Sequence, residues 1–194
     1  MLMAVSVPGV ALGDDLNPPT YRFFPNSTFT EWNGLFIVPF FLSVDDGFPL
    51  AGSGVPTVQM NPVAGGSDWS FFQPNFVDNL AMKKLRIQVT YSQAGPFGPA
   101  ITGVTGVKGA GPGVPATDVS GLLSIPMAVP GRPGFRYFAR DFEFFPNPDF
   151  ETIDMTVPFG VTIDQVVIDS ISIPEPGSLV MLTAGGLMLA RRMR

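Results

Sequence analysis

The sequence predicts an all-β protein built as a two-sheet β-sandwich. Its 194 residues include 22 glycines and 21 prolines, which interrupt the chain too often for long helices to form. Residues 84–91 alternate between apolar and polar side chains, which is the period of a strand with one face in water. The 18 phenylalanines argue against the alternative of a loosely ordered chain rich in Gly and Pro. Several short strands with frequent turn signals favour a sandwich.

Residues 1–13 precede the predicted domain and resemble the end of a secretory signal peptide. They hold no charge, and the small residues Ala11 and Gly13 have the spacing of a cleavage site. The basic start of a signal peptide is missing. Either the true start lies upstream of Met1 or the segment is not a signal, and we interpret it as a truncated signal-peptide remnant.

The domain itself is predicted to span residues 14–173. Residues 35–44 are nearly all apolar, as in a central strand covered on both faces, although Pro39 indicates a bulge or a break. Residues 94–115 are rich in Gly and Pro and predict long loops around one short strand. The remaining predicted strands cover residues 84–91, 101–107, 135–145, 151–157 and 161–173.

The charge and composition of this domain exclude several functions. It holds 8 basic and 15 acidic residues, a net charge of −7, so nucleic acid is not an expected partner. The chain has no Cys and no His, which excludes disulfides, thiolate chemistry, Ser-His-Asp hydrolysis and His-ligated metals. We expect no catalytic residues, no enzyme activity, and no cofactor other than a hard cation bound through oxygen atoms.

One carboxylate pair suits glycoside hydrolysis by its spacing. Asp141 and Glu143 share a strand face about 7 Å apart. Phe142 and Phe144 would then point inward, and we interpret the two acids as a solvated face rather than an active site.

The last twenty-one residues, 174–194, form a separate segment. Pro174, Glu175 and Pro176 predict an extended, exposed tripeptide, because each proline disfavours helix before it. An uncharged run of thirteen residues, 178–190, follows; as a helix it would be about 20 Å long, short for a membrane core of about 30 Å. The segment ends with a basic cluster that would stay on the cytoplasmic side of a membrane. This basic end consists of Arg191, Arg192 and Arg194.

This order of parts resembles the PEP-CTERM sorting signal of exported bacterial proteins, over about a tenth of the chain. The resemblance implies a substrate of an exosortase, a membrane protease-transpeptidase that cuts near the tripeptide. It also implies a protein of a Gram-negative-type bacterium that is exported, anchored transiently in the inner membrane, and then released to the cell surface or extracellular matrix. The alternative is a buried C-terminal helix of the domain, which an apolar helix without a polar face fits poorly.

The last predicted strand carries a second, weaker resemblance. Residues 167–173 read Val-Ile-Asp-Ser-Ile-Ser-Ile. This run is similar to the closing strand of galactose-binding-like jelly rolls, whose pattern is apolar-Ile-Asp-Asp/Asn-apolar-x-apolar. That family includes many carbohydrate-binding modules. The resemblance implies a jelly roll and a candidate structural calcium at Asp169, although Ser170 replaces the family's second acidic or amide residue.

The environment of Asp169 can also be predicted from alternation. The residue shares a strand face with the apolar Val167 and Ile171, so its carboxylate needs a partner. Three alternatives remain. The carboxylate binds a calcium ion, it pairs with an arginine such as Arg136 or Arg140, or a bulge turns the side chain outward.

Candidate sugar-binding residues are few. The aromatic rings with the chemistry to stack on sugars are those of Trp32, Trp69 and Tyr91, although large aromatics more often belong to the core. We therefore expect an exported surface or matrix protein with a non-catalytic structural or adhesive domain. The alternative is a carbohydrate-binding module for the cell's own exopolysaccharide.

Overall fold

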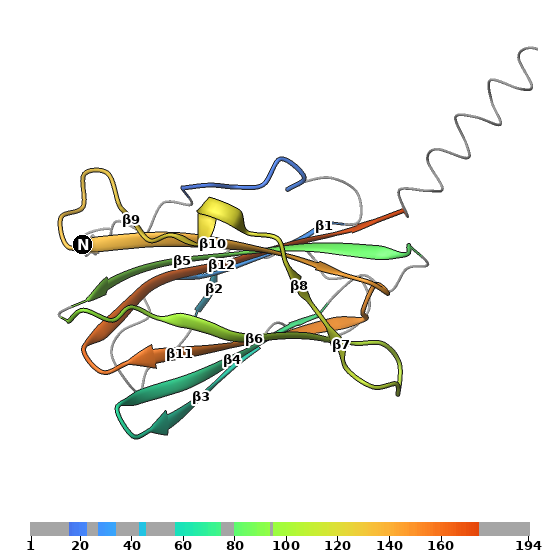
Figure 1. Ribbon diagram of the computed structural model, residues 1–194, viewed down its shortest axis with the longest axis horizontal. Coiled ribbons are helices and arrows are strands. Elements are labelled where there is room, and N and C mark those ends of the chain that lie inside the picture. The colour runs from blue at the N-terminus through green and yellow to red at the C-terminus, as the bar shows by residue number, and fades with distance from the viewer. Residues whose placement is uncertain are drawn as a thin grey trace, which may run out of the picture.

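In the computed structural model, the chain forms two antiparallel β-sheets that lie face to face (Figure 1). The structure describes residues 16–22, 27–33, 43–45, 57–74, 80–93 and 95–174. The all-β prediction is confirmed for these residues, in which the helical structure is the 3₁₀ turn η1 (Gly121–Ser124). The predicted remnant at 1–13 and the C-terminal apolar helix lie outside the described residues. Of the strand predicted at 35–44, residues 43–44 belong to a short strand, Ser43–Asp45, and the rest lie outside the described residues.

The larger sheet has seven strands, and the last strand of the domain lies near its centre. In spatial order its strands are β2 (Ser43–Asp45), β1 (Ser27–Asn33), β12 (Val161–Ile173), β5 (Met82–Gln93), β10 (Phe135–Phe144) and β8 (Thr117–Asp118), with β9 (Met127–Ala128) also paired to β10. Because β12 pairs with both β1 and β5, the end of the chain joins two early strands.

The smaller sheet has five strands and covers one face of the larger one (Figure 1). In spatial order these are β3 (Thr57–Val63), β4 (Gly66–Pro74), β11 (Phe150–Pro158), β6 (Ala100–Val107) and β7 (Val114–Pro115). Residues of β11 alternate strictly between buried and half-buried, which is the pattern of a strand with one face on the core.

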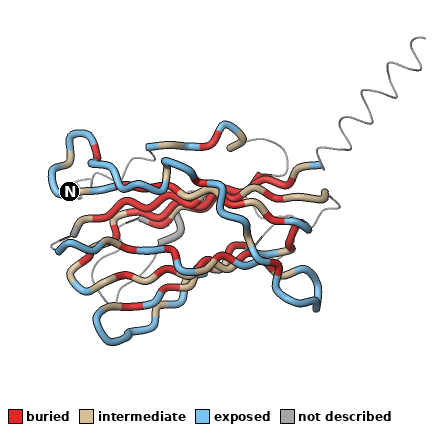
Figure 2. The backbone as a smooth tube through the Cα atoms, viewed as in Figure 1, coloured by how far each residue is buried: buried red, intermediate tan, exposed pale blue. Residues whose placement is uncertain are grey.

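The core lies between the two sheets, where the buried strand residues gather in Figure 2. Trp32 from the larger sheet meets Phe71 from the smaller one with ring centroids 5.3 Å apart in an edge-to-face arrangement, a preferred aromatic geometry. Leu85, Ile87 and Val89 supply the inward face of β5, as their alternation predicts.

A bulge in β12 decides which side chains face this core. The pairing register with β5 shifts between Ile163 and Gln165, so one extra residue reverses the alternation. Ile163 faces the core before the bulge, and Val166 and Ile168 face it afterwards. Asp169 therefore projects from the outer face of the larger sheet.

That outer face is nevertheless covered by two segments of chain. Residues 16–22, the N-terminal strap, lie along it on the side away from the smaller sheet (Figure 1). The strap is attached through Asn17, whose backbone N–H donates to Gln88 Oε1 (3.2 Å) and whose carbonyl accepts from Arg86 Nη1 (3.1 Å). The loop before β10 adds a second apolar cluster that includes Val129. As a result, every residue from Gln165 to Ser172 is buried.

Most of the predicted strands correspond to strands of the structure. The predictions at 84–91, 101–107, 135–145, 151–157 and 161–173 are confirmed as β5, β6, β10, β11 and β12. The strands β1, β3 and β4 were not predicted.

Candidate functional site

The predicted sorting motif begins where the domain ends. Strand β12 runs to Ile173, and Pro174 is exposed immediately after it. Glu175 and Pro176 lie outside the described residues, as do Arg191, Arg192 and Arg194. The described strands therefore end before the predicted motif begins.

Asp169 is fully buried and has an arginine partner. Its carboxylate forms a bidentate pair with Arg22 of the strap, with both Nε···Oδ1 and Nη2···Oδ2 at 2.5 Å. The partner is thus neither Arg136 nor Arg140, the arginines that the sequence suggested. Arg22 also lies 4.2 Å from the centroid of the Phe29 ring, so the strap is held by both charge and packing.

A chain of hydrogen bonds continues from Asp169 across the outer face. Gln88 donates to Asp169 Oδ2 (3.4 Å) and accepts from the Tyr137 hydroxyl (2.8 Å). Burial raises the pKa of Tyr21 in the strap, and the negative charges of Asp169 and Asp141 raise it further. The whole arrangement fixes the strap to the sheet, and calcium at Asp169 stays an untested prediction.

The two acids with a glycosidase-like spacing each pair with a basic residue of β5. Asp141 receives two hydrogen bonds from Arg86, both 2.6 Å, and Glu143 lies 3.1 Å from Lys84. The hydrogen bond to Asp141 is the main reason that the pKa of Arg86 is raised. These cross-strand pairs give both acids a structural role.

The three candidate sugar-stacking rings belong to the core. Trp32 is 0%, Trp69 2% and Tyr91 2% exposed. Trp69 donates its indole N–H to Ser67 (2.6 Å), and Tyr91 packs edge-on against Phe138 with centroids 6.1 Å apart. None of them offers a ring face to a sugar, which corrects their assignment as candidate binding residues: they stabilise the packing between the sheets.

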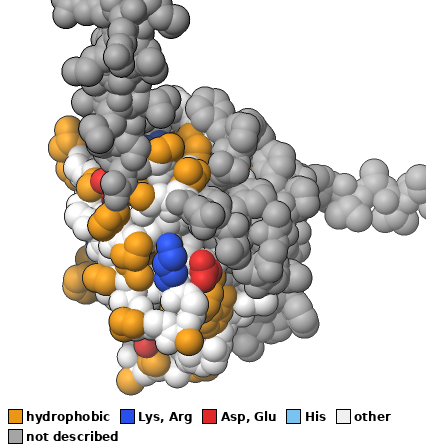
Figure 3. Space-filling view, turned by 90° about the vertical axis from the view of Figure 1, so that its right-hand side faces the viewer, with side chains coloured by type: hydrophobic (Ala, Val, Ile, Leu, Met, Phe, Trp, Pro, Cys, Tyr) orange, Lys and Arg blue, Asp and Glu red, His pale blue; other side chains and the backbone are white. Residues whose placement is uncertain are grey.

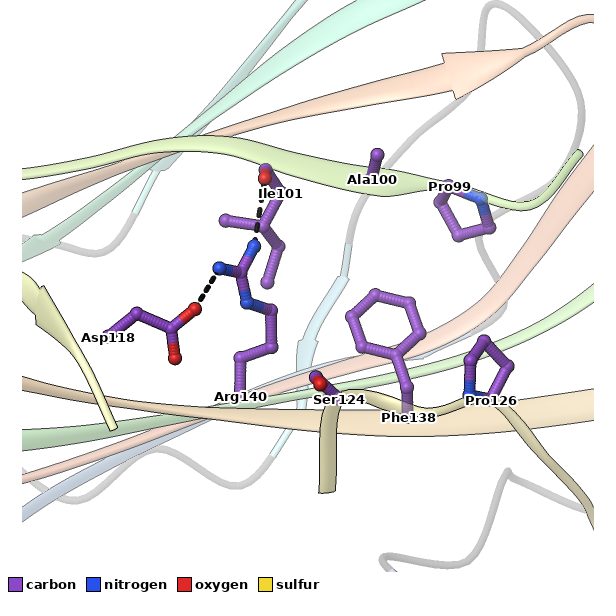
Figure 4. Close-up of a pocket in the computed structure, with 8 residues that line it drawn as sticks. All are labelled: Pro99, Ala100, Ile101, Asp118, Ser124, Pro126, Phe138 and Arg140. Carbon is purple, nitrogen blue, oxygen red and sulfur yellow. Dashed lines mark hydrogen bonds and ion pairs between the residues drawn. The ribbon is translucent and has the colours of Figure 1, made fainter. Parts of the chain in front are cut away.

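A pocket of about 290 Å³ lies at one edge of the sandwich, between β6 and β10 (Figure 4). Arg140 crosses it, donating from Nη1 to the Ile101 carbonyl (3.0 Å) and from Nη2 to the carboxylate of Asp118. The pocket is lined by Pro99, Ala100, Ile101, Asp118, Ser124, Pro126, Phe138 and Arg140. It therefore combines one charged pair with apolar walls.

The charge of Asp118 is stabilised by its neighbours. Partial burial acts to raise the pKa of Asp118, but hydrogen bonds from Ser120 and Arg140 outweigh this and hold it below its usual value. The carboxylate is hence ionised at neutral pH and lines the pocket as a hydrogen-bond acceptor.

Sequence reasoning missed a buried ion pair that joins the two sheets. Lys83 of β5 and Glu151 of β11 have side chains with 0% exposure, and Nζ lies 3.2 Å from Oε1. The alternation of the strand could have shown one partner, because Lys83 lies on the same inward face as Leu85 and Ile87.

The described ranges hold neither a metal-binding cluster nor a membrane-spanning helix. No cluster of three or more His, Cys, Asp or Glu residues able to hold a metal occurs there. No helix there is long and apolar enough to cross a membrane. No protein-family model, curated protein or solved structure matches this chain.

Proposed function

We propose that this is an exported surface or matrix protein whose C-terminal sorting signal is cut by an exosortase-type membrane protease. The observation that carries the proposal is the boundary at Ile173, the last residue of the last strand, which the Pro-Glu-Pro tripeptide follows directly. Cleavage after this point would release a β-sandwich with all its described strands. The inner membrane is then a transient partner, and the released domain has a structural or adhesive role.

We further propose that the sandwich is a jelly roll. Successive strands change sheets from β4 to β5 to β6 and again from β10 to β11 to β12, and the last strand lies beside the first. This double alternation is the connectivity expected of a jelly roll. The fold alone assigns no ligand.

Other features of the surface are in keeping with a non-catalytic domain. The acids at 141 and 143 have basic cross-strand partners. On the described part of the end face in Figure 3, apolar and uncharged side chains prevail, without a gathering of Lys or Arg. Nucleic acid is thus not a proposed partner.

Mass spectrometry of the protein recovered from the cell surface tests the processing. We expect a mature chain that lacks residues 177–194, because the tripeptide directs the cut. Cells without the exosortase are the control and should retain the uncut chain. An intact terminus at Arg194 in cells with a working exosortase would contradict the proposal.

A second candidate function is binding of exopolysaccharide, which the edge pocket favours. Its ion pair offers donors and an acceptor to vicinal hydroxyls, and Phe138, Pro99 and Pro126 supply apolar walls. If sugar binds there, Asp118→Asn should weaken affinity for the cell's own exopolysaccharide about tenfold, a loss of about 1.4 kcal/mol. Isothermal titration calorimetry would measure it. Asp164→Asn, in a partly buried pair with Arg132 that does not line the pocket, is the matched control. Equal affinities for both variants and the unmodified protein would contradict this function.

A further inference from the structure

The buried pair of Lys83 and Glu151 lies in unusual surroundings for two charged groups. It crosses the space between the sheets, and both side chains are fully shielded from solvent. Next to Lys83 on the same sheet is its register partner Phe144, also fully buried. Burial removes the hydration that stabilises both ions, so proton transfer from Lys83 to Glu151, which leaves two neutral groups, costs less there than in water. An uncharged amine is a nucleophile.

A buried carboxamide belongs to the same end of the sandwich as Lys83. Asn147, 2% exposed, follows β10, and its backbone N–H donates to the Ala81 carbonyl (2.8 Å) just before β5. Its Nδ2 donates to Ser172 Oγ (3.1 Å). Ser172 is the direct cross-strand partner of Lys83. Asn147 thus contacts the residue directly opposite Lys83 on the β5–β12 strand pair. Glu151, the ion-pair partner of Lys83, is four residues beyond Asn147 in the chain.

This end of the sandwich is closed tightly. A Cβ on Gly106, the partner of Glu151 in β6, would lie 2.5 Å from Pro148 Cβ and 3.3 Å from the Phe144 ring. That packing excludes solvent, and a dry site strengthens the interactions within it.

We propose that Lys83 and Asn147 form an intramolecular isopeptide bond, with Glu151 as the proton shuttle. Glu151 first takes a proton from the Lys83 ammonium, which leaves a neutral amine and a carboxylic acid. The amine then attacks Cγ of Asn147, and Glu151 relays a proton from the attacking nitrogen to Nδ2. The Cγ–Nδ2 bond breaks as the Nζ–Cγ bond forms, ammonia leaves, and Glu151 remains protonated. No oxidant or reductant is needed.

The bond would tie the connection between β10 and β11 to the start of β5. It goes beyond the proposed function and does not depend on it. It would supply a covalent staple to a chain without cysteine. Asn147 is also protected from the common competing reaction, because Pro148 has no backbone N–H to attack the carboxamide.

Peptide mapping of the purified, denatured full-length chain tests the bond directly. We expect a linked pair of peptides, one with Lys83 and one with Asn147, whose mass is their sum less one ammonia. Ammonia loss at Asn33, which precedes Gly34, would lower the intact mass by the same amount as the isopeptide bond. Only the linked peptide pair therefore identifies the bond. Unmodified linear peptides in full yield would overturn the proposal. A linked pair that contains Gln73, the register partner of Glu151, would overturn the assignment of Asn147.

Variants test the assigned roles. Lys83→Met should abolish the linked pair, whereas Lys84→Met, on the exposed neighbour, should leave it unchanged. Glu151→Gln should lower its yield at least tenfold. If Glu151→Gln does not fold, peptide mapping of the unmodified chain still shows whether the bond forms. Glu151→Asp, which withdraws the carboxyl group by one carbon, should then slow bond formation during refolding. An unchanged rate in Glu151→Asp would overturn the role of Glu151 as shuttle.

Discussion

Replacing Asp169 with alanine should destabilise the protein by about 3–5 kcal/mol, because it leaves the guanidinium of Arg22 buried without its carboxylate. The two side chains are 0% and 8% exposed, so water cannot take the place of the lost partner. The strap would also lose its anchor on the outer face. Urea unfolding followed by tryptophan fluorescence would measure the change in the free energy of unfolding.

Asp164→Ala is the matched control for this effect. Asp164 also forms a bidentate pair with an arginine, Arg132, whose side chain is 25% exposed. Because water reaches both side chains, loss of this pair should cost less than loss of the Asp169 pair. Equal losses of stability in the two variants would show that burial adds nothing to the free energy contributed by the Asp169 pair.

A chelator should leave the melting temperature of the protein unchanged. A fall in melting temperature on chelation that Asp169→Ala abolishes would instead support the calcium prediction.

Trp32→Ala should cost about 3–5 kcal/mol, the range for removing a large aromatic side chain from a core. Trp32 is fully buried and packs against Phe71 across the two sheets, so the change leaves a cavity that neither sheet can fill. The same urea titration, read by circular dichroism because a tryptophan is lost, gives the value.

Phe159→Ala is the control for Trp32→Ala, because its ring is 86% exposed in the turn between β11 and β12. Its effect should stay within about 0.5 kcal/mol. A loss of sugar binding without loss of stability in Trp32→Ala would contradict the core role given to this ring.

The sequence carries a strong signal for strands whose two faces differ. Residues 84–91 could be assigned because the inward positions are apolar and the outward ones polar, and the structure extends this strand to Met82–Gln93. Strand β4 was missed although Trp69 and Phe71 alternate, because the inward positions at its ends are the polar Ser67 and Gln73. Strand β3 lies at an edge with mostly exposed side chains, so it has little apolar periodicity to detect.

Contacts between distant residues could not be predicted in the same way. Alternation placed Asp169 correctly with Val167 and Ile171, but only the bulge in β12 directs that face away from the smaller sheet. Its partner Arg22 is 147 residues away in the chain. Neither a bulge nor a long-range partner leaves a mark in local sequence, since both depend on how the sheets pack.

The position of β12 has a consequence for the order of events during synthesis. The strand that joins β1 to β5 is the last of the domain to leave the ribosome, so the larger sheet stays divided until it arrives. Pairing of β12 with β1 closes a loop of more than half the domain, and pairing with β5 closes a loop of about half. Strand pairs that close such long loops form slowly. The larger sheet is therefore incomplete until this final strand has been made. Its completion coincides with synthesis of the segment that follows Ile173.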